Sequence, residues 1–276
     1  MNIPQMNLLK RLLVLLAAAV LLAATPLAQA GRSCEARKTT AQTVERGMAL
    51  AEKTLASLNA SGEKVVLLAR AGQDLSKYGV RYSHLGLAWQ VPDGQGGKTW
   101  HVLHKLNSCG TAESAVYRQG LGEFFLDDLW RYEAAWLAPT PDVQARLLAL
   151  LQNPAGATRM HHKPYSLVSY AWGRKYQQSN QWAIETLAAA MEPGITSRDK
   201  AQAWLQFKGY EPTVLSLGPL TRLGARVSAA NVAFDDHPND KRFSDRIETV
   251  TVDSVFQWLQ KAQLSVPGKP VTVVRL

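Results

Sequence analysis

The sequence of 276 residues holds few cysteines and no strongly biased segment. Cys34 and Cys109 are its two cysteines. The apolar run Leu12 to Ala24 has 13 residues, whereas a membrane-spanning helix needs about 20. No run of basic residues, internal repeat or low-complexity tract occurs, so neither nucleic-acid binding nor a repeat architecture is indicated. These shortages favour a globular protein whose mature form has no transmembrane span.

The first 30 residues have the pattern of a secretory signal peptide. Lys10 and Arg11 precede the apolar run, and Ala28-Gln29-Ala30 supplies a small-x-small cleavage site. We therefore expect cleavage after Ala30 and a periplasmic or secreted mature chain, residues 31–276. Cys34 lies four residues beyond this cut, which argues against a lipid-modified N-terminus.

The mature chain carries a moderate excess of positive charge. Residues 1–30 hold two basic and no acidic residues, so their removal leaves 29 basic against 22 acidic residues, a net charge of +7. In an exported protein this excess fits an anionic envelope or polymer better than nucleic acid. The length suits one domain with a full hydrophobic core.

The two cysteines are predicted to form a disulfide, because an isolated pair in an oxidising compartment is normally bridged. The bond would tie the N-terminus of the mature chain to a turn 75 residues later. The alternative makes Cys109 a nucleophile. Its setting, LNSCGT, is typical of a strand exit and not of the helix start that activates a thiol.

The pattern of apolar residues predicts an α+β fold, an antiparallel sheet packed with helices. Helical spacing covers residues 39–61, 141–152, 180–191 and 197–210. Strand patterns cover residues 64–72, 82–91, 99–106 and 210–217, and the turn PDGQGG joins the middle two as a hairpin. A Phe-rich stretch after Gly122 is predicted as a strand or a short helix, residues 222–234 are ambiguous, and residues 246–262 predict a strand followed by a helix capped near Asp253.

The hairpin carries two histidines that could act together. Side chains alternate along a strand, so His84 and Leu85 point to opposite faces of the sheet, and so do His104 and His101. Facing residues on adjacent strands lie about 5 Å apart, so His104 is close enough to orient the ring of His84. Such a pair is the arrangement that activates a hydroxyl or thiol. The alternative is a partly buried structural histidine.

A serine opens the helix predicted over residues 180–191. Ser179 fits the role of helix N-cap, and equally the place where an enzyme sets a nucleophile, since the helix start stabilises negative charge. The helix has one apolar stripe, formed by Trp182, Ala183, Thr186, Leu187, Ala190 and Met191. Stepping back along this stripe reaches Ser179, so we expect it to face the protein interior.

Other polar groups offer weaker candidates. His101 and His104 form H-x-x-H, but on a strand they point to opposite faces, which disfavours a shared zinc ion. His161 and His162 precede Pro164 and are predicted as a solvated loop. Asp235, Asp236, His237 and Asp240 could hold a cation, although the sequence around them is typical of a polar turn. We predict no metal and no cofactor.

Four motifs, YSHLGLAW, LHKLNSCGT, YQQSNQW and FDDHP, occur in this order, and with them the whole mature chain resembles the exported bacterial family DUF2145, of unknown function. Residues 80–190 are more distantly similar to the circularly permuted NlpC/P60 papain-like group. The match is Ser83-His84-Leu85-Gly86-Leu87 for its histidine strand and Pro164-Tyr165 for its P-Y-D element. Ser179 stands where that group has its catalytic cysteine.

The resemblance implies a papain-like core around residues 80–190 that acts on amide or ester bonds of cell-envelope peptides or lipids. It implies Ser179 as nucleophile, His84 as base and His104 as orienting residue. The substrate would lie against the side chains near these three, namely Tyr82, Tyr165, Asn180, Gln181 and Trp182. The alternative is a catalytically silent binding module that kept the cleft. A protein partner is not indicated.

Overall fold

The computed structural model describes residues 39–127 and 129–276, and the predicted signal peptide and Cys34 lie outside them. A six-stranded antiparallel sheet forms the centre, with strand order β4-β3-β2-β1-β5-β8. Its strands are β1 (Val65–Ala71), β2 (His84–Pro92), β3 (Lys98–Asn107), β4 (Ser114–Gly120), β5 (Arg131–Leu137) and β8 (Thr272–Arg275). The predicted α+β class with an antiparallel sheet is confirmed.

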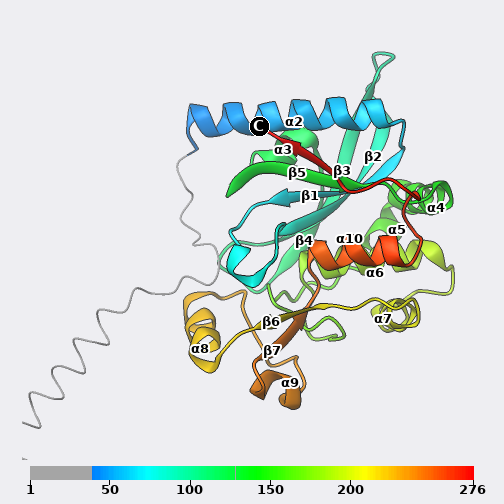
Figure 1. The fold of residues 1–276 in the computed structure, drawn as a ribbon. Coiled ribbons are helices and arrows are strands. Elements are labelled where there is room, and N and C mark those ends of the chain that lie inside the picture. The colour runs from blue at the N-terminus through cyan, green and yellow to red at the C-terminus, as the bar shows by residue number, and fades with distance from the viewer. Residues whose placement is uncertain (1–38, 128) are drawn as a thin grey trace, which may run out of the picture.

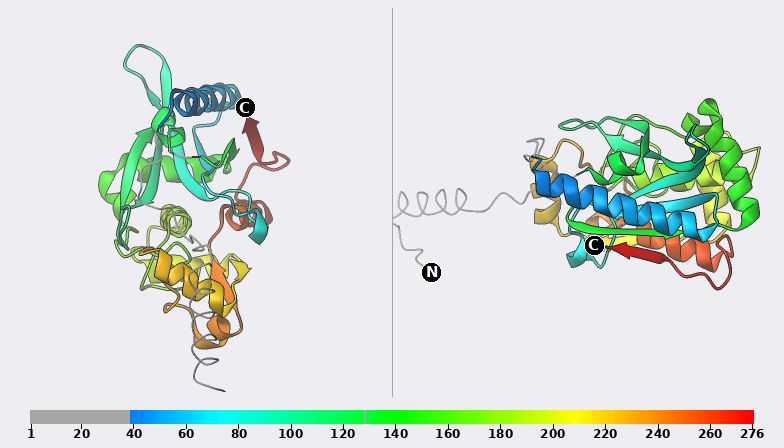
Figure 2. Two further views of the ribbon diagram at one scale, coloured as in Figure 1. Left: turned by 90° about the vertical axis from the view of Figure 1, so that its left-hand side faces the viewer. Right: turned by 90° about the horizontal axis from the view of Figure 1, so that it is seen from above.

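Helices cover both faces of this sheet (Figures 1 and 2). Helices α2 (Ala41–Ser61) and α3 (Leu121–Phe125) pack on one face, and α4 (Pro141–Gln152), α6 (Ser179–Met191) and α10 (Val252–Lys261) on the other. The short helix α5 (Pro154–Thr158) follows α4, and α7 (Arg198–Phe207) packs on α6. The sheet thus separates two hydrophobic cores, which we call the α2 side and the α6 side.

The start, the end and the buried face of helix α2 follow from local sequence signals. Thr40 caps it in a reciprocal box with Thr43, and Gly62 ends it in the left-handed conformation, with φ of 75°. Its buried residues recur at helical spacing, namely Gly47, Leu50, Ala51, Thr54 and Leu58. This face covers the α2 side of the sheet.

Strand alternation assigns the hairpin residues to the two cores. Leu85, Leu87 and Leu103 belong to the α6 side, whereas Val102 belongs to the α2 side, as the strand period predicts. The strand β2 begins at His84, two residues later than predicted. At Gly86 the two strands approach closely, since a Cβ there would lie 2.5 Å from Cγ1 of Val102.

Helix α6 differs from its prediction in two ways. Gln178 is the N-cap, its side chain accepting the Asn180 amide, and Ser179 is the first helical residue. The helix is also buried on every side from Ser179 to Ala189, not along one stripe. The physical reason is its central position, enclosed by the sheet, α4 and α7.

A smaller unit follows α7. Strands β6 (Thr213–Ser216) and β7 (Arg246–Thr249) pair antiparallel, flanked by α8 (Pro219–Ser228) and α9 (Asn239–Phe243). These elements lie at the bottom of Figure 1 and surround a third core. The ambiguous segment is therefore helix α8 and a turn. Thr251, not Asp253, caps helix α10, because the Asp253 carboxylate accepts the Arg81 amide.

Candidate functional site

The two hairpin histidines meet at one end of the sheet. Nε2 of His84 lies 2.8 Å from Nδ1 of His104, and Nε2 of His104 lies 2.7 Å from Oε1 of Gln119 on β4. The imidazole rings are nearly perpendicular, with centroids 5.1 Å apart. The predicted contact between His84 and His104 is therefore present, and Gln119 extends it into a line of three polar groups.

The charge state of His104 fixes the direction of these hydrogen bonds. Burial and, to a smaller extent, the positive charge of Arg70 lower the pKa of His104 to about 4, opposed by the hydrogen bond to Gln119 and the charge of Asp127. The ring is therefore neutral at neutral pH, with one donor and one acceptor nitrogen. Since the Gln119 oxygen only accepts, Nδ1 of His104 accepts from Nε2 of His84.

Both rings lie on the α2 side of the sheet. The ring of Phe124, at the centre of the α2-side core, is 5.9 Å from the His84 ring and 5.1 Å from the His104 ring. Arg70 stacks over the same phenyl ring at 4.6 Å and forms an ion pair with Asp127. The histidine pair therefore lies beside a charged pair and an aromatic core.

Ser179 begins the helix on the α6 side. Its hydroxyl lies 3.5 Å from the Tyr165 hydroxyl, and both residues are almost fully buried. The Nζ atom of Lys105, which points away from His104 across the sheet, is 5.9 Å from the centre of the Tyr165 ring. The structure thus brings His84 to His104, and brings Ser179 to Tyr165.

The side chains predicted to bind substrate are buried, and all but Trp182 are hydrogen-bonded within the protein. The Tyr82 hydroxyl donates to Glu133 at 2.7 Å, Asn180 Oδ1 accepts the Leu85 amide at 2.9 Å, and Gln181 Oε1 accepts from Ser169 at 2.8 Å. Trp182 is fully enclosed in the α6-side core. The Asn180 bond holds α6 against the start of β2, and a role of these side chains in substrate binding stays a prediction.

Sequence reasoning did not identify the buried network around Lys105. Its Nζ donates to the His162 carbonyl and to Gln177 Oε1, each at 2.7 Å. Glu185, buried in α6, pairs with Arg198 at 2.8 Å. Burial lowers the pKa of Lys105 to about 6, helped by Arg198 and opposed by Glu185. The sequence signal that could have revealed this network is a lysine among the apolar residues of a predicted strand.

The remaining polar candidates also have internal partners. His101 packs edge-on against Trp89, on the opposite face from His104. The carboxylates of Asp235 and Asp236 bond to Lys175 and to the Tyr170 amide. The ring of His237 bonds Asp236 and the Glu248 carbonyl. Across residues 39–127 and 129–276, no group of three potential metal ligands is found.

The adjacent histidines before Pro164 lie in a loop, as predicted, but are only partly exposed to solvent. Both are half-buried, and His162 Nε2 contacts the Lys175 carbonyl at 3.1 Å. Burial and, to a smaller extent, the charge of Lys105 lower the pKa of His161 to about 4. The reason is that their loop packs over the Lys105 network.

Cys109 follows β3, where the sequence predicted a strand-exit turn. The described residues contain no free cysteine, so Cys109 is not an available thiol there. Its bridge to Cys34 stays a prediction. Within the same residues, no helix has both the length and the apolar character to cross a membrane.

The fold and this polar sheet end define an α+β protein of a family without an assigned activity. Residues 57–259, well over half of the chain, match the family described as "Uncharacterized protein conserved in bacteria (DUF2145)", and the chain belongs to it. No curated protein and no solved structure matches the chain.

Proposed function

We propose that this protein is an exported binding module of the bacterial cell envelope and that Ser179 does not cleave its ligand. The proposal rests on the positions of Ser179 and His84, the expected nucleophile and base. His84 contacts Phe124 and His104 on the α2 side, whereas Ser179 begins the helix of the α6 side and contacts Tyr165. A serine nucleophile needs a base within about 3 Å or one bridging water.

The start of helix α6 supports the same proposal. An acyl-transfer site needs free backbone amides to stabilise the oxyanion. Here the Asn180 amide donates to Oε1 of Gln178 at 2.9 Å, and the Trp182 amide donates to the Gln178 carbonyl at 3.0 Å. Two amides at the helix start are thus engaged by the cap residue Gln178. Tyr165 also keeps its proton, because burial raises the pKa of its hydroxyl.

A hydrolase or acyltransferase remains the second candidate, with Ser179 as nucleophile, His84 as base and His104 as orienting residue. One observation favours it, the line from His84 through His104 to Gln119 with distances of 2.8 and 2.7 Å. A base held by a second polar group is how a catalytic histidine is oriented. Its substrate would be a cell-envelope peptide or lipid.

A fluorophosphonate probe separates the two candidates. The protein is purified from the compartment to which it is exported and incubated with the probe beside an active serine hydrolase. We expect labelling of the hydrolase and none of this protein. Labelling that disappears in both Ser179→Ala and His84→Ala would overturn the binding-module proposal in favour of the hydrolase.

A further inference from the structure

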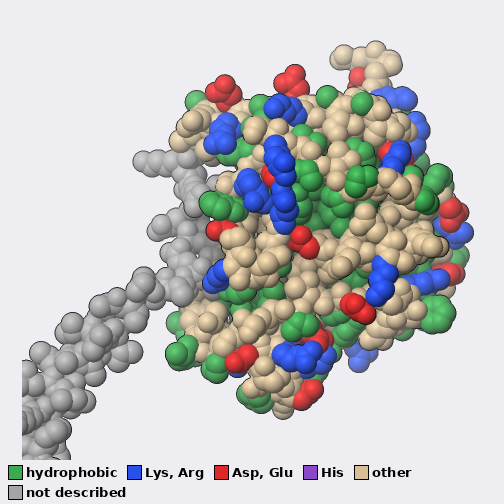
Figure 3. All heavy atoms as spheres, in the orientation of Figure 1, with side chains coloured by type: hydrophobic (Ala, Val, Ile, Leu, Met, Phe, Trp, Pro, Cys, Tyr) green, Lys and Arg blue, Asp and Glu red, His purple; other side chains and the backbone are tan. Residues whose placement is uncertain are grey.

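Helix α8 carries its large apolar side chains on the outside of the protein. Leu220, Leu223 and Val227 are 85 %, 61 % and 78 % exposed, whereas the buried residue of the helix is the small Ala225. The three exposed residues lie at positions i, i+3 and i+7 and form one stripe, which we call the α8 stripe. Figure 3 shows hydrophobic side chains at the surface over α8, at the lower left of the molecule. A surface helix normally turns such a stripe toward the core, so an outward stripe indicates a partner that covers it.

The neighbouring helix α9 exposes a further apolar side chain, that of Phe243. Arg222 of α8 forms an ion pair with Asp245, two residues beyond Phe243, so the two helices are joined. Figures 1 and 2 place both helices at the end of the molecule opposite α2. The α8 stripe therefore lies at an end of the protein, which can meet an extended flat surface.

The charges of α8 favour an anionic partner. Residues 212–234 contain two arginines, Arg222 and Arg226, and no acidic residue. Arg222 is mostly buried and held by Asp245, whereas Arg226 is exposed and borders the α8 stripe beside Val227. An apolar stripe bordered by arginine is typical of a helix that lies in a membrane interface. Its apolar side chains enter the acyl layer, and the guanidinium reaches the lipid phosphates.

A second copy of the chain fits the α8 stripe less well than a membrane does. In a symmetric dimer α8 would pack on itself, and the Arg226 side chains of both copies would lie at one interface. Residues 212–234 supply no carboxylate to pair with them. An anionic lipid surface supplies phosphate groups at the same place, so the charge selects the membrane.

We propose that α8 attaches the protein to an anionic phospholipid surface, with Leu220, Leu223 and Val227 in the apolar layer and Arg226 on the lipid phosphates. The inference goes beyond the proposed function and rests on it only for the envelope location of the protein. One short helix with three apolar anchors gives reversible attachment, because binding strength scales with the apolar area that enters the membrane.

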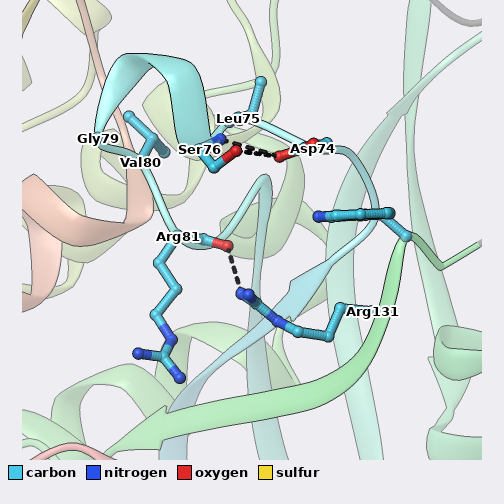
Figure 4. Close-up of a pocket in the computed structure, with 8 residues that line it drawn as sticks. Asp74, Leu75, Ser76, Gly79, Val80, Arg81 and Arg131 are labelled. Carbon is cyan, nitrogen blue, oxygen red and sulfur yellow. Dashed lines mark hydrogen bonds between the residues drawn. The ribbon is translucent and has the colours of Figure 1, made fainter.

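The attached helix would hold the whole protein in one orientation. Val80 packs in the third core of the smaller unit. The carbonyl of the next residue, Arg81, accepts an N–H of Arg131 on β5 at 3.3 Å (Figure 4), and the Arg81 guanidinium bonds both oxygens of Glu133 on the same strand. The smaller unit is thus joined to the sheet, and attachment through α8 places α2 on the side away from the lipid.

Flotation with lipid vesicles tests the proposal on the full mature chain. One set of vesicles contains phosphatidylglycerol and phosphatidylcholine, and the other contains phosphatidylcholine alone. We expect the protein to float with the anionic vesicles and much less with the neutral ones. Leu223→Ser should lower the partition coefficient about tenfold, as the loss of one buried leucine implies. Arg226→Gln should lower it about fivefold on the anionic vesicles and leave the neutral ones unchanged. Both side chains are exposed, so both variants should fold as the parent does.

The matched control is Phe207→Ser. Phe207 is 82 % exposed beside Lys208 at the end of α7, which lies away from α8 in Figure 1, so this variant should bind as the parent does. The proposal is wrong if the protein does not float with anionic vesicles, if neutral vesicles bind it equally, or if Leu223→Ser floats like the parent. Equal loss of binding in Phe207→Ser would also overturn it, as would a dimer that Leu223→Ser dissociates and that binds no vesicles. Fluorophosphonate labelling reports on Ser179 alone, so the two proposals can fail separately.

Discussion

Lys105 is a buried lysine whose lowered pKa favours the neutral form above about pH 6. It is fully buried, and its two hydrogen bonds go to acceptors, the His162 carbonyl and Gln177 Oε1. A neutral amine has two N–H groups, which matches these two acceptors. Burial, aided by Arg198 and opposed by Glu185, lowers the pKa of Lys105 to about 6, whereas an unfolded lysine titrates at about 10.4.

This residue makes stability depend on pH. Between pH 6 and 10 the unfolded chain binds a proton at Lys105 that the folded protein does not, so stability rises with pH by up to about 1.4 kcal/mol per unit. We expect the free energy of unfolding in urea to rise from pH 6.5 to 8.5, and to rise less in Lys105→Met. The exposed Lys98 on the same strand provides the control, Lys98→Met. Equal slopes in all three proteins would contradict a neutral Lys105.

At the scale of the elements, the sequence predicted best those helices and strands whose ends are marked by a helix-starting proline or a turn. Helix α4 covers the expected residues 141–152 because Pro141 starts it, and the PDGQGG turn correctly indicated the β2–β3 hairpin. The edge strands β4 and β8 and the short helix α5 did not stand out as separate elements, since each is held mainly by its neighbours, whereas the Phe-rich stretch predicted as a strand or a short helix is α3.

The sequence likewise predicted only those parts of the candidate site that depend on local structure. Alternation within one hairpin predicted the contact of His84 with His104, because both positions belong to one local unit. The partner of Ser179 depends on where α6 packs, which is decided by contacts far apart in the sequence. The burial of α6 on all sides has the same origin, since Glu185 needs Arg198 from α7 to lie inside. No periodicity within the helix contains that information.

The approach of β2 to β3 at Gly86 gives a prediction for this pair of strands. In Gly86→Ala the new Cβ would lie 2.5 Å from Cγ1 of Val102 and 3.5 Å from the His104 Cβ. Overpacking of this kind costs about 1 to 3 kcal/mol, so we expect a lower free energy of unfolding and shifted NMR signals of the His104 ring. Gly194→Ala meets no atom within 4 Å and should change neither. An undisturbed Gly86→Ala would show that the strands can separate here at little cost.

Across the whole molecule, the loop before β2 connects the smaller unit to the sheet. Val80 packs in the third core, whereas Tyr82, two residues later, packs in the α6-side core. The Arg81 side chain between them bonds the carboxylate of Glu133 on β5. This short loop is therefore held by both parts of the fold.

The disulfide prediction concerns the whole chain, because it joins the N-terminus of the mature protein to the turn after the strand of His104. A bridge that closes a loop of this length removes entropy from the unfolded chain worth roughly 4 to 5 kcal/mol on the loop-closure model, and such bonds in practice give about 2 to 4 kcal/mol. We therefore expect reduction to lower the melting temperature by roughly 5 to 15 °C, and Cys109→Ser to melt at the temperature of the reduced parent.

Mass spectrometry of non-reduced, alkylated protein from its native compartment should find neither Cys34 nor Cys109 modified. Two alkylated cysteines would contradict the bridge and would return Cys109 to the candidate nucleophiles.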